Sequence, residues 1–169
     1  MTTTVSTDIQ NTRNARRIER DRQRRIAQDE RAERKRSRKN GFTNVEFRQA
    51  DVFDLLTELY RAGGHPYDFI ILDPPAFTKS SSTVRAAERG YKEINLKAMR
   101  LLPRGGYLAT CSCSHFMTET LFRHMLHDAA ADAGVSLRQI EARRQAPDHP
   151  ILWNVPETDY LKFYIFQVV

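Results

Sequence analysis

Two apolar runs, each ending in chemically active side chains, constrain the fold of this chain more than any other feature. The first run covers residues 69–72 and ends in Asp73-Pro74-Pro75. The second covers residues 107–110 and ends in Cys111-Ser112-Cys113-Ser114. Sequence sufficient for one helix lies between them, which is typical of a β-α-β unit in a parallel sheet. Because parallel strands end at the same sheet edge, we expect a carboxylate and a thiol to meet there.

Length and composition limit the class of protein. With 169 residues and 40% hydrophobic content, the chain is expected to form one domain with a modest core. No apolar stretch approaches the roughly 20 residues of a membrane helix, and the N-terminus lacks a charged-then-apolar signal segment. The two cysteines, Cys111 and Cys113, are too close along one strand to join distant elements. These features predict a cytoplasmic protein in a reducing compartment, with no membrane partner.

The positive charge is concentrated in an N-terminal arm, residues 1–39. Residues 1–40 hold 13 Lys/Arg and 6 Asp/Glu, whereas the other 129 residues hold 14 and 15. The few apolar residues of the arm form no continuous stripe, so we expect a solvated helix or a disordered segment. A second interpretation is that the arm binds RNA phosphates, which would make binding strongly dependent on salt.

The composition changes at Asn40-Gly41, which is suited to a left-handed helix stop, and residues 40–169 are predicted to form the folded body. Its pattern predicts an α/β fold with a mainly parallel sheet and a C-terminal antiparallel strand pair. The expected strands are 45–50, 69–72, 107–111, 135–143 and 160–169, and the expected helices are 52–62, 85–102 and 116–133.

Several motifs of the body occur together in one known family. They are Asn40-Gly41-Phe42, Ala50-Asp51-Val52-Phe53-Asp54, Leu72-Asp73-Pro74-Pro75-Ala76-Phe77, Gly90-Tyr91-Lys92-Glu93-Ile94-Asn95, Ser112-Cys113-Ser114, Asp148-His149-Pro150 and Tyr160-Leu161-Lys162. Residues 40–169 resemble the C-terminal part of the class I SAM-dependent large-subunit rRNA cytosine-C5 methyltransferases, the type that carries a PUA domain. In amino-group methyltransferases an aromatic residue directly follows the two prolines, whereas here Ala76 intervenes. The resemblance implies a partial Rossmann-like fold, S-adenosylmethionine (SAM) as cofactor and rRNA as partner.

The resemblance also implies roles for individual residues. Cys113 corresponds to the nucleophile that adds to cytosine C6, whereas Cys111 falls at a variable position. Asp73 would accept a hydrogen bond from the cytosine amino group. The implied cofactor-binding residues are Asp51 at the adenine edge, Val52 on its ring, Asp73 and Pro74.

Alternative interpretations of these side chains remain open. Cys113 could be a buried, inert strand residue. Cys111, Cys113 and His115 alternate onto one strand face, but structural zinc sites normally use four ligands from paired elements, so no metal site is expected.

Other side chains have both a structural and a functional interpretation. Lys92 and Asn95 lie one helical turn apart and could contact RNA or only support their helix. The aromatic residues are assigned to core packing, although an exposed one could stack on a flipped base. They are Trp153, Tyr160, Phe163, Tyr164 and Phe166.

Part of the expected cofactor site is missing from the sequence. A SAM site in this fold needs a glycine-rich turn after the first strand and an acid after the second, but no glycine precedes Gly41. The family sheet order is 3-2-1-4-5-7-6, so the missing pair would lie between strands 45–50 and 69–72. We therefore expect direct pairing of those two strands, a homodimer or edge-strand partner, or poor folding.

Two functional hypotheses follow. One is a SAM-dependent rRNA cytosine-C5 methyltransferase that works when a partner chain supplies the glycine-rich half. The other is a non-catalytic remnant of a truncated or frame-disrupted gene, with at most weak RNA binding through the basic arm.

Overall fold

The computed structural model describes residues 4–78 and 80–169, with side chains from residue 17 onward. The chain forms two compact units, residues 1–50 and 51–169. No helix in the described part of the chain is both long enough and apolar enough to cross a membrane.

The first unit contains the long helix α1 (Thr4–Lys39) and the segment that follows it. The helix ends as the Asn40-Gly41 pair predicts, with Gly41 in the left-handed region at φ 79°. The Phe42 amide donates to the Ser37 carbonyl at 3.0 Å, and the Ser37 hydroxyl donates to the Phe42 carbonyl at 3.1 Å. These reciprocal bonds satisfy carbonyl and hydroxyl groups at the helix end and reverse the chain there.

The strand predicted at residues 45–50 does not form, and that prediction is wrong. The segment is irregular and almost wholly exposed, and the Gln49 amide donates to Glu30 Oε1 of α1 at 3.0 Å. A strand requires a neighbouring strand to satisfy its backbone groups. Because no strand pairs with this segment in the described structure, alternation of apolar and polar residues was not sufficient to produce one.

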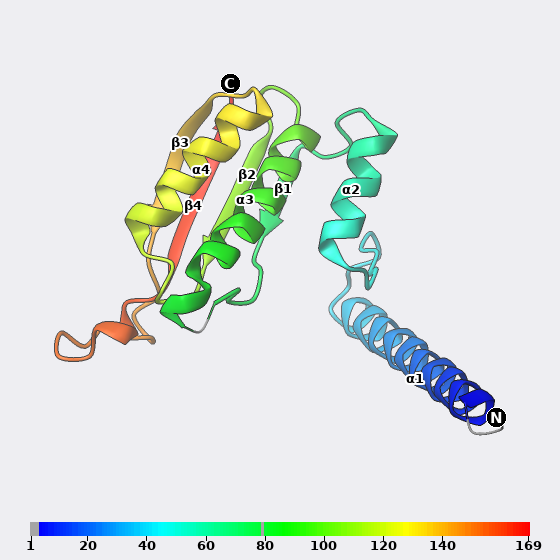
Figure 1. Ribbon diagram of the computed structural model, residues 1–169. Helices are drawn as coiled ribbons and strands as arrows, with labels where there is room; N and C mark the ends of the chain where they lie inside the picture. The colour runs from blue at the N-terminus through cyan, green and yellow to red at the C-terminus, as the bar shows by residue number, and fades with distance from the viewer. Residues whose placement is uncertain (1–3, 79) are drawn as a thin grey trace. The chain divides into compact units, whose positions relative to one another are not determined.

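The second unit is built on a four-stranded mixed sheet (Figure 1). Its strands are β1 (Phe69–Leu72), β2 (Tyr107–Ser112), β3 (Leu137–Arg143) and β4 (Lys162–Val168), in the order β1-β2-β4-β3. β1 and β2 are parallel, whereas β4 is antiparallel to both β2 and β3. The predicted α/β class and C-terminal antiparallel pair are therefore confirmed, and the order matches the last four positions of the expected methyltransferase sheet.

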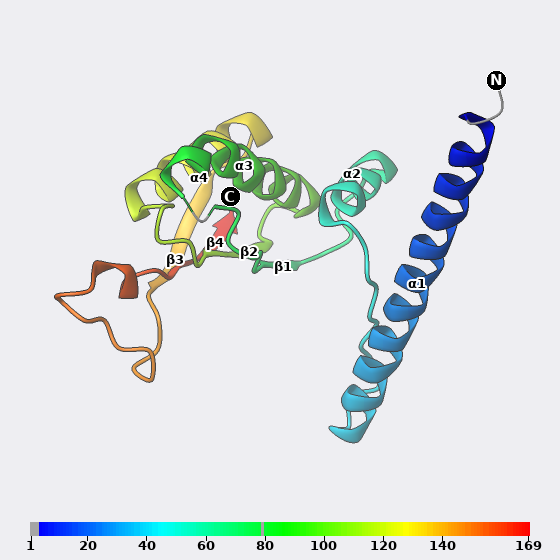
Figure 2. The same cartoon turned by 60° about the horizontal axis from the view of Figure 1, so that its bottom comes forward.

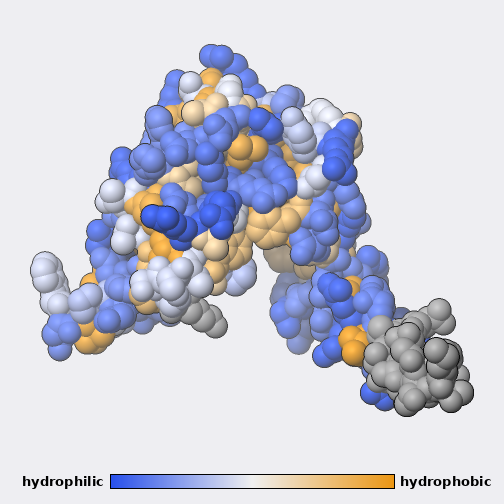
Figure 3. Space-filling model, in the orientation of Figure 1, coloured by the Kyte–Doolittle hydropathy of each residue, from blue (hydrophilic) through white to orange (hydrophobic). Residues whose placement is uncertain are grey.

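Two helices, α3 (Val84–Leu101) and α4 (Glu119–Ala133), cover one face of this sheet (Figure 2). A third helix, α2 (Val52–Ala62), packs on α3. Most apolar positions of α3 recur at helical spacing and are buried, which fixes the helix on the sheet. The central core residues are Tyr91, Ile94, Ala98, Met99, Leu108, Phe122, Met125 and Tyr164. The outward surface over α3 and α4 is mostly hydrophilic, with scattered apolar residues (Figure 3).

Strand β1 is the edge of the sheet among the described strands, since it pairs only with β2. Leu72 is buried, but Phe69 and Ile71 are 48% and 67% exposed. An apolar run of this kind is typical of a buried strand, but these two residues are not part of the core. The helices cover only the face that carries Ile70 and Leu72, so the alternate residues of β1 have no covering layer in the described structure.

Candidate active site

Asp73 and Cys111 are brought together by the parallel pairing of β1 and β2. Leu72 pairs with Thr110. The residues that follow them, Asp73 and Cys111, therefore lie at the same edge of the sheet. The Cys111 thiol donates to Asp73 Oδ1 at 3.1 Å and approaches the Leu72 carbonyl at 3.5 Å. Burial, followed by the hydrogen bond to Asp73, raises the pKa of Cys111 to about 12. Cys111 is therefore a neutral donor at physiological pH, and it holds the exposed carboxylate of Asp73 in place.

Cys113 lies one residue beyond the end of β2 and is only partly buried. The serines on either side of it are buried and hydrogen-bonded. The Ser112 hydroxyl donates to the Tyr91 hydroxyl at 3.1 Å, and the Ser114 hydroxyl donates to the Thr78 carbonyl at 3.0 Å. Because Thr78 follows the Asp-Pro-Pro-Ala-Phe segment, this bond ties the two motif loops together and fixes the backbone around the Cys113 thiol.

Lys162 begins β4 and pairs with Ser112 across the antiparallel ladder. It is 8% exposed, and its ammonium donates to the carbonyls of Ser114 at 2.6 Å and Tyr160 at 2.7 Å. Burial lowers the pKa of Lys162, and the nearby Cys113, Asp159 and Glu119 oppose that shift. The buried Lys162 side chain, held by two carbonyl acceptors, also interacts electrostatically with Cys113. The Tyr160-Leu161-Lys162 motif assigned no role to Lys162, although a lysine within an apolar strand indicates a buried charge.

Tyr91 lies in the core beneath the Ser112-Cys113-Ser114 segment, where its hydroxyl accepts the bond from Ser112. It is fully buried, its ring lies 4.5 Å from that of Phe77, and burial raises the pKa of its hydroxyl. Asn95 is also fully buried and donates to the Tyr91 carbonyl at 2.8 Å. Lys92 forms an ion pair with Asp132 at 2.7 Å. Of the two interpretations of Asn95, only the structural one is compatible with its burial.

Asp51 and Val52 occur at the start of α2. Asp51 is the N-cap of this helix, where Oδ1 accepts the amides of Phe53 at 2.9 Å and Asp54 at 3.3 Å. These contacts satisfy two free amides of the first turn. Val52 is 38% exposed, so its side chain has surface available for a ligand. Pro74 is partly buried next to Asp73.

The aromatic residues near the C-terminus separate into two groups. Tyr164 is 2% exposed and belongs to the core, with Phe166 packed against it, so the packing assignment is confirmed for these two. Trp153 is 99% exposed, and its assignment to the core is wrong. No cluster of three or more potential metal-ligating side chains is present among the residues that the structure describes.

The sheet order and its helices define a Rossmann-like methyltransferase fold, and comparisons with known proteins agree. Residues 17–155 match a family model described as a methyltransferase domain. The chain belongs to this methyltransferase domain family.

Named relatives add detail to this family assignment. The "Ribosomal RNA large subunit methyltransferase I" proteins of Shigella dysenteriae serotype 1 and Escherichia coli O1:K1 / APEC are each 46% identical over 127 residues. That alignment covers 75% of this chain and 32% of each relative. The chain therefore spans about a third of the length of the curated relatives that it matches.

Two solved structures share the fold at 20% sequence identity. One is described as a methyltransferase complexed with SAH, and the other as a SAM-dependent methyltransferase from Streptococcus mutans. Each superposes with a TM-score of 0.61 over 75% of this chain and 32% of the other chain.

The described residues fit only part of the cofactor that this fold family uses. Asp51, Val52, Asp73 and Pro74 remain available at the ends of their elements, but no strand precedes β1 in the described chain. The glycines do not form a cofactor cradle. A Cβ at Gly90 would meet the Phe77 ring at 3.2 Å and one at Gly106 would meet Pro103, whereas the other five glycines have positive φ and no neighbour within 4 Å. The glycine-rich part of the site therefore does not come from these residues.

Proposed function

We propose that this chain carries the target-base half of a SAM-dependent rRNA cytosine-C5 methyltransferase, with Cys113 as nucleophile and Asp73 as the residue that holds the cytosine. The observation that carries the proposal is the different environment of the two thiols. The Cys111 thiol donates a hydrogen bond to Asp73, whereas Cys113 is partly exposed and interacts electrostatically with the buried Lys162. The 46% identity with proteins named as large-subunit rRNA methyltransferases supports rRNA as the substrate.

The proposed chemistry uses the side chains of this chain to activate the cytosine ring. The Cys113 thiolate forms a bond to C6, which moves electron density to C5 and makes that carbon nucleophilic. SAM supplies the methyl group for C5. Water then takes the C5 proton, the electron pair of that C–H bond restores the ring double bond, and the bond between C6 and sulfur breaks to release the Cys113 thiolate. Asp73 accepts a hydrogen bond from the amino group throughout, and the Lys162 ammonium stabilises the thiolate before addition and after elimination.

A non-catalytic role in weak RNA binding is a second candidate. It is favoured by the exposed edge of β1 and by the partial fit of the cofactor. In this role the arm, whose 13 Lys/Arg outnumber its 6 Asp/Glu, would supply the affinity, and binding would fall steeply as salt is raised.

Calorimetry with SAM and nucleoside analysis of the RNA distinguish these candidates. The enzyme candidate expects 1:1 binding of SAM and the appearance of 5-methylcytidine in unmethylated large-subunit rRNA. Measurable binding of SAM would rule out the remnant, and its absence would rule out a chain that acts alone. Methylation at the amino nitrogen of cytosine would contradict the assigned chemistry.

A further inference from the structure

Trp153 is the single tryptophan of the chain, and its side chain is 99% exposed. Large aromatic side chains contribute most to stability or binding energy when their rings are buried, and exposed ones are enriched at binding surfaces. Trp153 belongs to the loop between β3 and β4, which projects from one end of the sheet (Figure 1).

The loop that presents Trp153 is held by its own hydrogen bonds. The Thr158 hydroxyl accepts the Leu152 amide at 2.8 Å and donates to the Val155 carbonyl at 2.7 Å. At the base of the loop, Arg144 pairs with Asp159 at 2.9 Å, and Gln145 donates to the Thr158 carbonyl. These bonds involve residues before and after Trp153 in the sequence, so the indole projects from a loop with a defined conformation.

Trp153 also lines a pocket of about 500 Å³, within the range of ligand-binding cavities. The pocket lining combines apolar side chains with charged and polar ones. Besides Trp153, the lining includes His115, Glu119, Arg144, Asp159 and Lys162.

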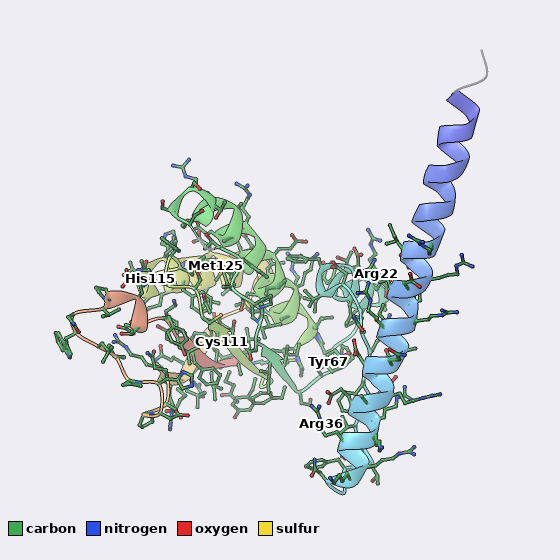
Figure 4. All side chains as sticks on the ribbon, turned by 90° about the horizontal axis from the view of Figure 1, so that it is seen from below. Arg22, Arg36, Tyr67, Cys111, His115 and Met125 are labelled. Carbon is green, nitrogen blue, oxygen red and sulfur yellow. The ribbon has the colours of Figure 1, made fainter. Side chains whose placement is uncertain are left out.

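The pocket adjoins the candidate nucleophile. Lys162, one of its lining residues, donates to the carbonyl of Ser114, and His115 follows Cys113 by two positions. Figure 4 shows Cys111 within the sheet and His115 toward the end that carries the loop. A polymer that places one base at Cys113 would therefore have its neighbouring residue within reach of this pocket.

We propose that this pocket binds an unpaired RNA base next to the target cytosine, with the Trp153 indole as its stacking surface. The inference rests on the proposed function, because it requires RNA at Cys113. Arg144 is already paired with Asp159 and Glu119, so phosphate attraction contributes little here. Stacking on a flat indole and hydrogen bonding to the polar lining side chains suit a nucleobase, which has flat faces and polar edges.

Fluorescence of the single tryptophan gives a direct test with the full chain. The probe is a single-stranded 12-nucleotide RNA with one central cytidine, and the same sequence as a duplex is the comparison. We expect saturable quenching of Trp153 by the single strand and little by the duplex. In anisotropy titrations with fluorescein-labelled RNA, Trp153→Ala should weaken binding on the order of tenfold, whereas Trp153→Phe should restore most of it. Tyr67→Ala, which removes another exposed aromatic ring outside the pocket lining, should leave the affinity unchanged.

The outcomes separate this inference from the proposed function. If RNA binds and Trp153→Ala binds equally well, the base pocket is wrong and the proposed function stands. If the unaltered chain binds no RNA by anisotropy, both fail. Quenching by unrelated apolar peptides but not by RNA would assign the surface to a protein partner and overturn the inference.

Discussion

The Cys111 thiol donates a hydrogen bond to Asp73 Oδ1 at 3.1 Å, and this contact gives the two cysteines different roles. The protonated thiol keeps Asp73 at the end of β1, where the carboxylate is exposed to a ligand. Cys113, two residues after Cys111, lies beyond the end of β2 and is only partly buried. One cysteine therefore orients the acid, and the other is available for chemistry.

The buried Cys111 should make stability fall at alkaline pH. Its folded-state pKa is raised from 9.0 to about 12, so the folded chain binds this proton more tightly than the unfolded chain. The contribution is fully present below pH 9 and is lost as pH rises toward 12, with a slope of at most about 1.4 kcal/mol per pH unit. Urea unfolding at pH 7.5 and 10 should show a smaller loss for Cys111→Ala than for the unaltered chain. An equal loss would show that Cys111 ionises normally.

Removal of the Ser114 hydroxyl should loosen the two motif loops. Ser114→Ala breaks the bond to the Thr78 carbonyl and leaves a buried acceptor unpaired, so the free energy of unfolding should fall by about 1–3 kcal/mol. Chemical denaturation is the measurement. Ser136→Ala, at an exposed serine, is the matched control and should have little effect. Equal stability of the two variants would contradict the role of the Ser-Cys-Ser segment.

Removal of the Lys162 charge should slow the reaction of Cys113 with alkylating reagents. In a Cys111→Ala background, Lys162→Met removes a cation beside the thiolate and leaves the Ser114 carbonyl without this donor. We expect iodoacetamide labelling at pH 7.5 to slow by roughly fivefold or more. Lys162, Tyr91 and Cys111 interact electrostatically with Cys113, so Tyr91→Phe is measured in parallel to separate the effects of Tyr91 and Lys162.

Lys92→Met provides the control for the Lys162 change, because it removes a lysine that pairs with Asp132 on the surface. Its labelling rate should equal that of the unaltered background. If Lys162→Met labels at the same rate as Lys92→Met, the buried cation does not act on Cys113.

The exposed edge strand should promote self-association. Phe69 and Ile71 present apolar side chains on a strand that has one free edge in the described sheet, and such edges pair with other chains. Sedimentation velocity should show association that increases with concentration and is reduced by Ile71→Lys. Ile18→Lys, at an exposed isoleucine of α1, should not reduce it. A chain that remains monomeric at all concentrations would contradict this prediction.

The parts of the fold that could be predicted are those that depend on local patterns. The apolar runs at 69–72 and 107–110 gave neighbouring parallel strands, and the Asn40-Gly41 pair gave the end of α1. The strand at 45–50 was predicted from the same kind of pattern but found no partner strand. The absence of this strand shows that an alternating pattern indicates which face of a strand could be buried. It does not establish that a neighbouring strand is present.

The parts that could not be predicted depend on contacts between distant residues. Ser114 bonds to Thr78 across 36 positions, and Lys162 reaches Ser114 across 48, so neither contact leaves a local pattern. The exposure of Trp153 depends on how Thr158 closes its loop, which a list of aromatic positions cannot show. The distinction between Cys111 and Cys113 came from a motif resemblance, and the structure adds the Asp73 contact as a physical reason for it.

Covalent trapping with 5-fluorocytidine RNA tests the central claim most directly. The full chain is incubated with SAM and the modified RNA, and the attached peptide is identified by mass spectrometry. We predict an adduct at Cys113 that persists in Cys111→Ala and disappears in Cys113→Ala. An adduct that survives in Cys113→Ala, or one that is lost only in Cys111→Ala, would contradict the account.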